Sequence, residues 1–135
     1  MAAGRREPAL VRVVSAMMRA LGSAAVRLRV PVATGDGVLR ELGIAASAYQ
    51  EVHLAPVVVR DLREVDGREA IEVLISPATL DSVTPAVGVR NGWTFLRGVE
   101  QVVYAERVFA VTDVSADRFA GVAYMYHITA VASIA

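Results

Sequence analysis

Residues 101–133, QVVYAERVFAVTDVSADRFAGVAYMYHITAVAS, decide the fold class of this chain. Apolar, β-branched and aromatic residues alternate in register over Gln101–Val114 and again over Gly121–Ser133, which predicts two long strands. The polar segment Ser115–Ala120 is expected to link them. Both faces of these strands carry apolar groups, so we expect the protein's own core to cover one face and another subunit to cover the other. The pattern therefore favours a β protein that assembles with other subunits over an enzyme.

Shorter segments upstream show similar alternation and complete the expected domain. The other expected strands are Ala24–Val32, Tyr49–Leu62 with a kink at Ala55-Pro56, Glu69–Ile75 and Trp93–Leu96. Asp66-Gly67 signals a hairpin turn, and a short helix is expected over Ala78–Val83. We predict a single, mainly β domain over residues 1–135. It would be a small β-barrel or sandwich (residues 23–135) preceded by an N-terminal α-helix (residues 1–22).

The N-terminal segment has the spacing of an amphipathic helix with one basic flank. Pro8 suits a first helical position and Gly22 supplies a stop. The apolar residues between them that recur at helical spacing are Leu10, Val13, Val14, Met17, Met18 and Leu21. Arg5, Arg12 and Arg19 are seven residues apart, so they line one flank. Packing against the protein's own sheet or a partner is the favoured role for this helix, and membrane binding is the alternative.

Composition excludes several kinds of chemistry. The 135 residues are 55% hydrophobic, yet no uninterrupted apolar run approaches the ~18 residues of a membrane span. Arg12 and Arg19 interrupt the only stretch that resembles a signal peptide, so we expect a soluble chain that is cytoplasmic when made. There is no cysteine, and all 14 cationic side chains are arginine. Disulfides, thiolate metal sites, Schiff-base lysines and a P-loop lysine are therefore excluded.

Charge is balanced overall but divided along the chain. Residues 1–40 hold seven arginines against Glu7 and Asp36, a net charge of +5, so the remainder carries −5. This division suits an N-terminal arm that meets an acidic surface on another copy. A nucleic-acid-facing arm and ordinary solvated faces are the two other interpretations.

No set of residues in the sequence forms a recognisable catalytic or metal site. His53 and His127 lie on separate expected strands, and neither has a carboxylate or second histidine at metal-ligand spacing. Thr34–Gly37 contains two glycines but lacks the frame of a dinucleotide-binding loop, so we interpret it as a tight turn. We therefore expect no catalytic residues, no cofactor and no metal.

Several segments together resemble the small neck proteins of tailed bacteriophages. They are Tyr49–Arg60 (YQEVHLAPVVVR), the Asp66-Gly67 hairpin, Val73–Pro77 (VLISP), Val111–Val114 (VTDV) and Gly121–Tyr126 (GVAYMY). The resemblance covers roughly Tyr49 to Ala130 and is similar in particular to the head-closure group, also called stopper or head–tail joining proteins. It is a pattern of strands and a final hairpin, without a catalytic signature.

That resemblance implies a structural protein of the virion neck, present in the host cytoplasm before assembly. Its copies would form a sixfold or twelvefold ring between the portal or adaptor protein and the tail terminator or another tail protein. A loop of the ring would close the DNA channel, with non-specific contact to packaged DNA and no membrane. The N-terminal helix departs from the simplest form of the pattern, so an adaptor or a tail terminator stays open as well.

Within this interpretation, two groups of residues are candidates for function. The candidate partner-binding residues are Arg5, Arg12, Arg19 and Trp93. The candidate channel or partner loop is segment 76–93, represented by Ser76, Pro77, Pro85 and Asn91. A different class is a small-molecule-binding or enzymatic β-barrel, whose pocket would lie near Tyr104, Tyr124, Tyr126 and His127. A plain dimeric regulatory module is a third possibility.

Overall fold

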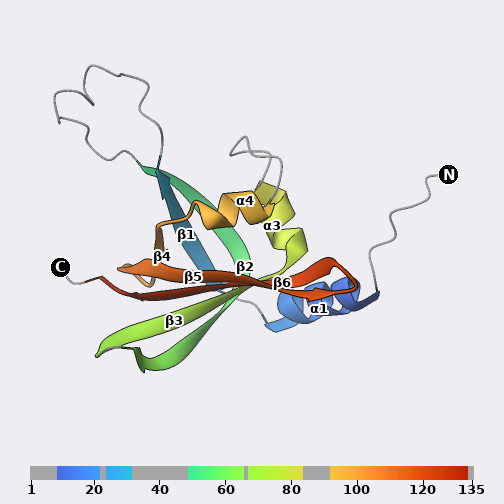
Figure 1. Cartoon of the computed structure of the whole chain (residues 1–135), viewed down its shortest axis with the longest axis horizontal. Helices are drawn as coiled ribbons and strands as arrows, with labels where there is room; N and C mark the ends of the chain where they lie inside the picture. Colours follow the sequence, from blue (N-terminus) through green and yellow to red (C-terminus); the bar gives the residue numbers. More distant parts are fainter. Residues whose placement is uncertain (1–8, 22–23, 32–48, 66, 84–91, 134–135) are drawn as a thin grey trace, which may run out of the picture.

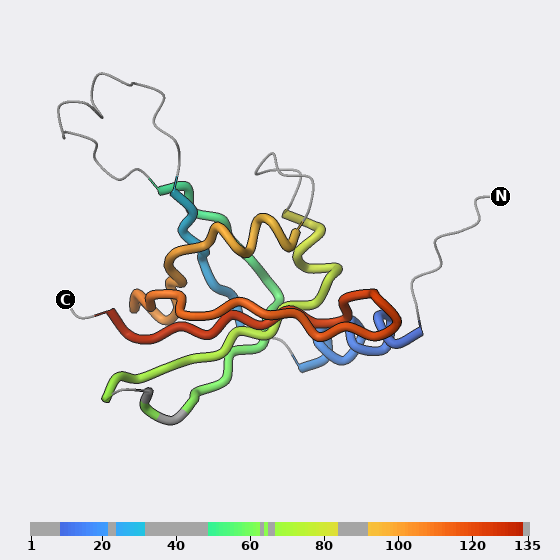
Figure 2. Tube along the Cα trace, in the orientation of Figure 1, coloured from blue at the N-terminus to red at the C-terminus, as the bar shows by residue number. Residues whose placement is uncertain are grey.

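The computed structural model describes residues 9–21, 24–31, 49–65, 67–83 and 92–133 (Figures 1 and 2). The helices are α1 (Ala9–Leu21), α3 (Pro77–Val83) and α4 (Gly92–Arg97). The strands are β1 (Ala24–Pro31), β2 (Tyr49–Val65), β3 (Arg68–Ile75), β4 (Gln101–Tyr104), β5 (Arg107–Phe119) and β6 (Val122–Ala132). The prediction of a mainly β domain with an N-terminal helix is confirmed.

The six strands close into a barrel, which selects between the two predicted β architectures. Their order around the barrel is β1-β2-β3-β6-β5-β4, and every neighbouring pair is antiparallel. The long strand β2 pairs with two neighbouring strands along its length. It pairs with β1 up to Val57 and with β3 from Val58 onward, so it changes partner just after the predicted kink at Ala55-Pro56. Closure depends on the short β1–β4 pairing, which runs from Arg27↔Val103 to Arg29↔Gln101.

The expected boundaries of the C-terminal strands are wrong at two turns. Gln101–Val114 is divided, because Ala105 and Glu106 adopt φ values of +50° and +64° and turn β4 back into β5. Ser115–Ala120 is no linker, because β5 continues to Phe119 and turns into β6 through Ala120 and Gly121, at φ +50° and +79°. Such two-residue turns usually carry Asn or Gly at both central positions. Ala-Glu and Ala-Gly give a weaker signal, and the flanking ladders hold these turns in place.

Residues 92–97 form a helix where a strand over Trp93–Leu96 was expected. Phe95 and Leu96 are consecutive and both are buried, whereas a strand with one face inward buries alternate residues. Four residues are too few for periodicity to separate the two structures. Gly92 lets α4 approach α3 closely, since a Cβ there would lie 2.5 Å from Leu80 Cδ2.

Helices α3 and α4 cover one end of the barrel (Figure 1) and complete its core. The short helix expected over Ala78–Val83 is thereby confirmed. Each strand contributes inward-facing apolar residues to one cluster, and the two helices and the segment after them add Leu80, Phe95, Leu96 and Val99. Fully burying one such side chain stabilises the fold by about 1.5–3 kcal/mol before entropy is counted. We call the end of the barrel that α3 and α4 cover the capped end.

Helix α1 packs outside this core. Its buried residues are Val11, Val14, Ser15 and Met18, spaced as one helical face, and they contact β2, β6 and α3. The expected helix is confirmed, but its expected apolar stripe is only partly covered. Val13, Met17 and Leu21 are 54%, 55% and 70% exposed. The barrel covers one face of α1 and leaves the neighbouring apolar face open.

Candidate functional site

The open apolar face of α1 is the first candidate for a functional surface. Because successive helical residues are rotated by about 100°, Val13, Met17 and Leu21 form a row centred roughly 110° around the helix from the buried face. We call these three residues the apolar row. Surface apolar residues that occur singly need no explanation, whereas these three lie together on one face of α1.

The predicted basic flank lies on the other side of the buried face. Arg12 and Arg19 are exposed, about 10 Å apart along the helix, and roughly 100° from the buried face. Within the described residues, no carboxylate forms an ion pair with either of them. Arg5 lies outside the described residues. Helix α1 therefore presents one buried face, one apolar face and one basic face.

A second exposed apolar group lies at the tip of the β5–β6 hairpin. Phe119 and Val122 flank the turn and are 64% and 41% exposed. The tip lies at the same end of the molecule as α1 (Figure 1), and α1 contacts β6. The apolar row and the hairpin tip thus give one end of the molecule most of its large exposed apolar side chains in the described part of the chain.

A cleft lies between the β2–β3 and β4–β5 hairpins, at the end of β5 remote from that tip. We call it the hairpin cleft, and its volume is about 350 Å³. Its lining residues are Asp61, Leu62, Glu69, Ala70, Ile71, Tyr104, Ala105, Arg107 and Phe109. Arg107 pairs with Glu69, and its guanidinium lies 5.3 Å from the centroid of the Phe109 ring. The lining thus combines an apolar floor with a charged rim, and two acids against one arginine leave it net negative.

Trp93, the remaining candidate partner-binding residue, belongs to an aromatic cluster near the capped end. Its ring is half-buried and stacks on Tyr126, with centroids 6.4 Å apart and planes 28° from parallel. The Arg118 guanidinium lies 5.9 Å from the Trp93 centroid. Burial, assisted by the negative charge of Asp81, raises the pKa of the Tyr126 hydroxyl, although Arg118 opposes the shift. Trp93 therefore already contacts its own chain, while part of its ring stays accessible.

Two of the candidate channel-loop residues begin a packed helix. Ser76 is buried and caps α3: its Oγ accepts a hydrogen bond from the Thr79 backbone N–H at 3.2 Å. Thr79 Oγ1 in turn donates to the Pro56 carbonyl at 3.1 Å, which ties the helix to β2. Pro77 is the first residue of α3. Pro85 and Asn91 lie outside the described residues, so any channel segment would start after Val83.

The structure does not bring Tyr104 together with Tyr126 and His127, with which it was proposed to line one pocket. Tyr104 lies opposite Arg107 on β5, whereas Tyr126 lies opposite Ala116. The nine-residue separation along β5 corresponds to about 30 Å. His127 also points to the face of β6 opposite that of Tyr126, because adjacent residues of a strand alternate. Tyr104 and Tyr126 therefore do not pack against each other, and Tyr104 belongs to the hairpin cleft.

The structure brings His127 together with two carboxylates that sequence spacing did not reveal. Its Nε2 lies 2.7 Å from Asp117 Oδ2, and its Nδ1 lies 3.6 Å from Glu72 Oε2. Arg60 pairs with Glu72 at 3.3 Å. The register across β3, β6 and β5 creates this contact, and a correct hairpin boundary would have been needed to predict it. Within the described residues, no group of three His, Cys, Asp or Glu side chains is placed to hold a metal ion.

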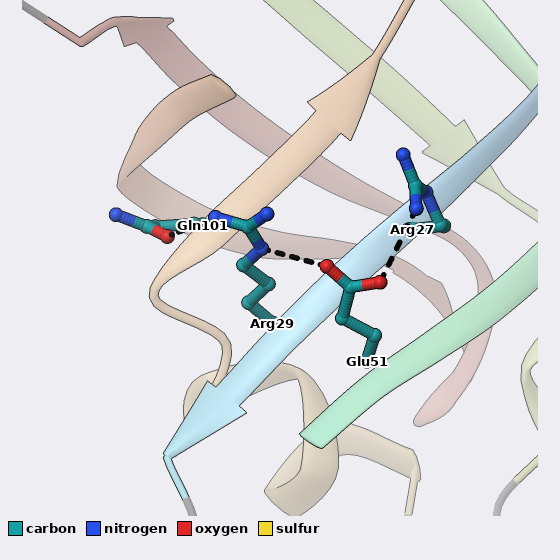
Figure 3. A network of polar contacts seen from close by, with 4 residues as sticks. All are labelled: Arg27, Arg29, Glu51 and Gln101. Carbon is teal, nitrogen blue, oxygen red and sulfur yellow. Dashed lines mark hydrogen bonds and ion pairs between the residues drawn. The ribbon is translucent and has the colours of Figure 1, made fainter. Parts of the chain in front are cut away.

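A further polar network supports the closing seam of the barrel (Figure 3). Glu51 on β2 accepts hydrogen bonds from Arg29 Nε at 2.9 Å and from Arg27 at 3.3 Å, both on β1. Arg29 also donates to Gln101 Oε1 on β4 at 3.3 Å. These side chains bridge the three strands that meet where β1 pairs with β4. The arginines of β1 thus connect the strands at this seam.

Comparisons with protein-family models, with curated proteins and with solved structures found no match. Among the described helices, none has both the length and the apolar character needed to cross a bilayer.

Proposed function

We propose that this chain is a structural protein of the neck of a tailed-phage-like particle. Its copies form a ring that joins the portal or its adaptor to the tail and helps to close the DNA channel. The observation that carries the proposal is the apolar row of α1, Val13, Met17 and Leu21, left open beside a barrel whose own core is complete. The resemblance of residues 49–130 to head-closure proteins gives the proposal its particular setting.

The physical argument concerns what the apolar row can do. The barrel holds its own core through its six strands and two helices, so these exposed side chains add nothing to the interior. Burying apolar surface stabilises an association by roughly 25 cal/mol per Å² before the costs of association are subtracted. A row of three large exposed apolar side chains on one helix therefore supports an assembly role.

The experiment is a deletion of the gene from the genome that encodes the particle. We expect DNA-filled heads and free tails that fail to join, seen by electron microscopy, with DNA lost from the heads. Purified wild-type particles should contain the protein in multiple copies by quantitative mass spectrometry.

The control is complementation with the wild-type gene, which should restore joined particles. Joined, infectious particles from the deletion strain without complementation would contradict the proposal, as would particles that lack the protein.

A further inference from the structure

We infer that the open edge of β5 receives an extended segment of a partner protein in which basic and apolar residues alternate. The edge concerned is that of residues 112–119, which we call the β5 edge. The basic residues of the partner segment face Asp113 and Asp117, and its apolar residues face the capped end. The inference goes beyond the proposed function, because it gives the chemistry of a binding partner on a surface that the neck role does not require.

The β5 edge has a neighbouring strand on one side only. β4 pairs with β5 from Arg107 to Ala110, whereas β6 pairs with it as far as Phe119. Among the described residues, no other strand pairs with β5. Alternate residues of an antiparallel strand direct their N–H and C=O groups to opposite sides, so a missing neighbour leaves a row of these groups unpaired. An extended backbone is the complement of such a row.

Two other strands also lack a second strand neighbour over part of their length, but helices pack on them. These strands are β2 and β6: α1 and α3 pack on β2, and α1 packs on β6. The main contacts of β5 are with β4 and β6 alone. Between two irregularities of the β5–β6 ladder, residues 113–117 keep an unbroken register with residues 125–129. That stretch has the common length of a strand in a globular protein.

A groove lies beside the start of the β5 edge, and its volume is about 300 Å³. Its lining residues are Arg97, Val99, Val111, Thr112, Asp113 and Val114. The three valines pack in or against the barrel core and supply an apolar floor. The volume lies at the lower end of the range for binding sites. The groove therefore offers a place for the apolar side chains of an added strand.

The other face of the β5 edge is acidic. Ile128 is fully buried and lies opposite Val114, so Asp113, Ser115 and Asp117 point away from the core by strand alternation. All three are exposed. Opposite charges on adjacent strands attract each other. This face therefore favours arginine or lysine at alternate positions of an added strand.

Charge also decides against a second copy of the β5 edge as the occupant. Antiparallel pairing of two such edges about a twofold axis at Ser115 would place Asp113 of each copy opposite Asp117 of the other. Like charges directly opposite are destabilising. On the groove side, Arg97 is exposed and forms no ion pair within the described part of the chain, so cations are disfavoured there. The complement is a strand with cations on one face and apolar residues on the other.

A synthetic peptide, Thr-Arg-Val-Arg-Val-Arg-Thr with blocked termini, is the probe for this edge. It is titrated into isotope-labelled protein and followed by amide chemical shifts. We expect saturable shifts concentrated in residues 111–119. A peptide with glutamate in place of each arginine should bind about tenfold more weakly, because three cross-strand pairs change from attraction to repulsion.

Backbone methylation tests strand pairing itself. Two further versions of the arginine peptide carry N-methyl groups on alternate residues, one version on the arginines and the other on the valines. Only one of these sets faces β5 in a paired strand. One version should therefore lose affinity on the order of tenfold, and the other should bind nearly as the parent does.

A charge exchange tests the acidic face. Asp113 forms no ion pair among the described residues, whereas Asp117 contacts His127, so Asp113 is the position to change. Asp113→Lys should weaken binding of the arginine peptide about fivefold and strengthen binding of the glutamate peptide. The matched control is Glu64→Lys, which changes an exposed acid just before the β2–β3 turn and should leave both affinities unchanged. Circular dichroism checks that both variants fold.

Several results would overturn the inference. These are no binding of the arginine peptide, equal effects of the two methylation patterns, and equal affinity for the arginine and glutamate peptides. Binding of the arginine peptide that does not respond to Asp113→Lys would do the same. Dimers of the wild-type protein that the arginine peptide dissociates in sedimentation experiments would assign the β5 edge to a second copy instead. None of these results depends on the outcome of the gene deletion.

Discussion

The interior of the barrel and the contact beneath α1 differ in how well their apolar side chains are buried and their polar groups are hydrogen-bonded. In the barrel, Leu28, Leu54, Leu96 and Ile128 are fully buried, and the buried hydroxyls of Ser76 and Thr79 are hydrogen-bonded. Beneath α1, the Ser15 hydroxyl is buried without a hydrogen-bond partner in the described part of the chain. The same helix leaves the apolar row in water.

The barrel interior is packed by the chain's own residues, whereas helix α1 is covered by them on one face only. A fully packed barrel with satisfied polar groups holds its shape by itself, because burial and hydrogen bonding both favour one arrangement. A helix that is half covered and carries an unsatisfied hydroxyl gains less from its own chain. Its exposed apolar face fits a surface that a second molecule completes.

The largest expected effect lies in the barrel core. Leu96→Ala removes a fully buried side chain from the capped end and should lower the free energy of unfolding by about 2–5 kcal/mol. Leu21→Ala makes the same chemical change on the apolar row and should alter it by less than ~0.5 kcal/mol. Urea titration at low protein concentration measures both. Similar losses in the two variants would show that the apolar row is already buried.

Two adjacent methionines allow the covered and open faces of α1 to be compared directly. Met18 is 4% exposed and Met17 is 55% exposed, so the same substitution probes the covered and open faces of one helix. Met18→Ala should cost about 2 kcal/mol, at the low end for buried Met→Ala changes, because α1 lies outside the main core. Met17→Ala should change the stability of the monomer by less than ~0.5 kcal/mol. A larger loss for Met17→Ala than for Met18→Ala in denaturant titrations would reverse our assignment of the faces.

A stabilising substitution is expected at Ser15. Ser15→Ala removes the unsatisfied buried hydroxyl and introduces a better helix former, so the free energy of unfolding should rise by about 1 kcal/mol. Ala16→Ser places a hydroxyl on the exposed neighbour as a control and should lower stability by a few tenths of a kcal/mol. Thermal unfolding followed by circular dichroism measures both. A loss of stability in Ser15→Ala would show that the hydroxyl has a partner.

The smallest expected effect is a pH dependence at the capped end. The pKa of Tyr126 is raised above its ordinary value of 10.0, mainly by burial. The unfolded chain therefore releases this proton at a lower pH than the folded chain does. The stabilisation associated with the neutral hydroxyl is complete below pH 10.0 and is lost as the pH rises through the folded-state pKa.

Tyr126→Phe tests this expectation, because it keeps the ring against Trp93 and removes the titrating group. Stability should fall less steeply in the variant than in the wild type when urea titrations are repeated above pH 10.0. Identical slopes would assign the alkaline loss to other groups.

Sequence patterns predicted the elements whose signals are local. The helix between Pro8 and Gly22 was predicted from apolar spacing and stop signals, and α1 spans Ala9–Leu21. The Asp66-Gly67 turn was predicted from its dipeptide, and Val65 pairs with Arg68 around it. By contrast, α4 was mistaken for a strand, because four residues carry too little periodicity and its helical form depends on filling the barrel end.

Among the candidate functional residues, some were predictable from local spacing and others required the tertiary structure. The exposure of Arg12 and Arg19 followed from their helical spacing. The apolar row did not, because the spacing of Val14 and Met18 is indistinguishable from that of Val13 and Met17 until the barrel is in place. The contact of His127 with Asp117 and Glu72 required the register of three strands.

Composition and local patterns were enough to predict a mainly β domain, an N-terminal amphipathic helix with a basic flank, and the absence of cysteine and lysine chemistry. Those properties follow from composition and from periodicity within a few turns or strand residues. The folded chain was needed to show that the sheet closes through β1 and β4, that tight turns form at Ala105-Glu106 and Ala120-Gly121, and which face of α1 is covered. Strand register, barrel closure and helix docking depend on contacts between residues distant in the chain, and local propensity does not fix those contacts.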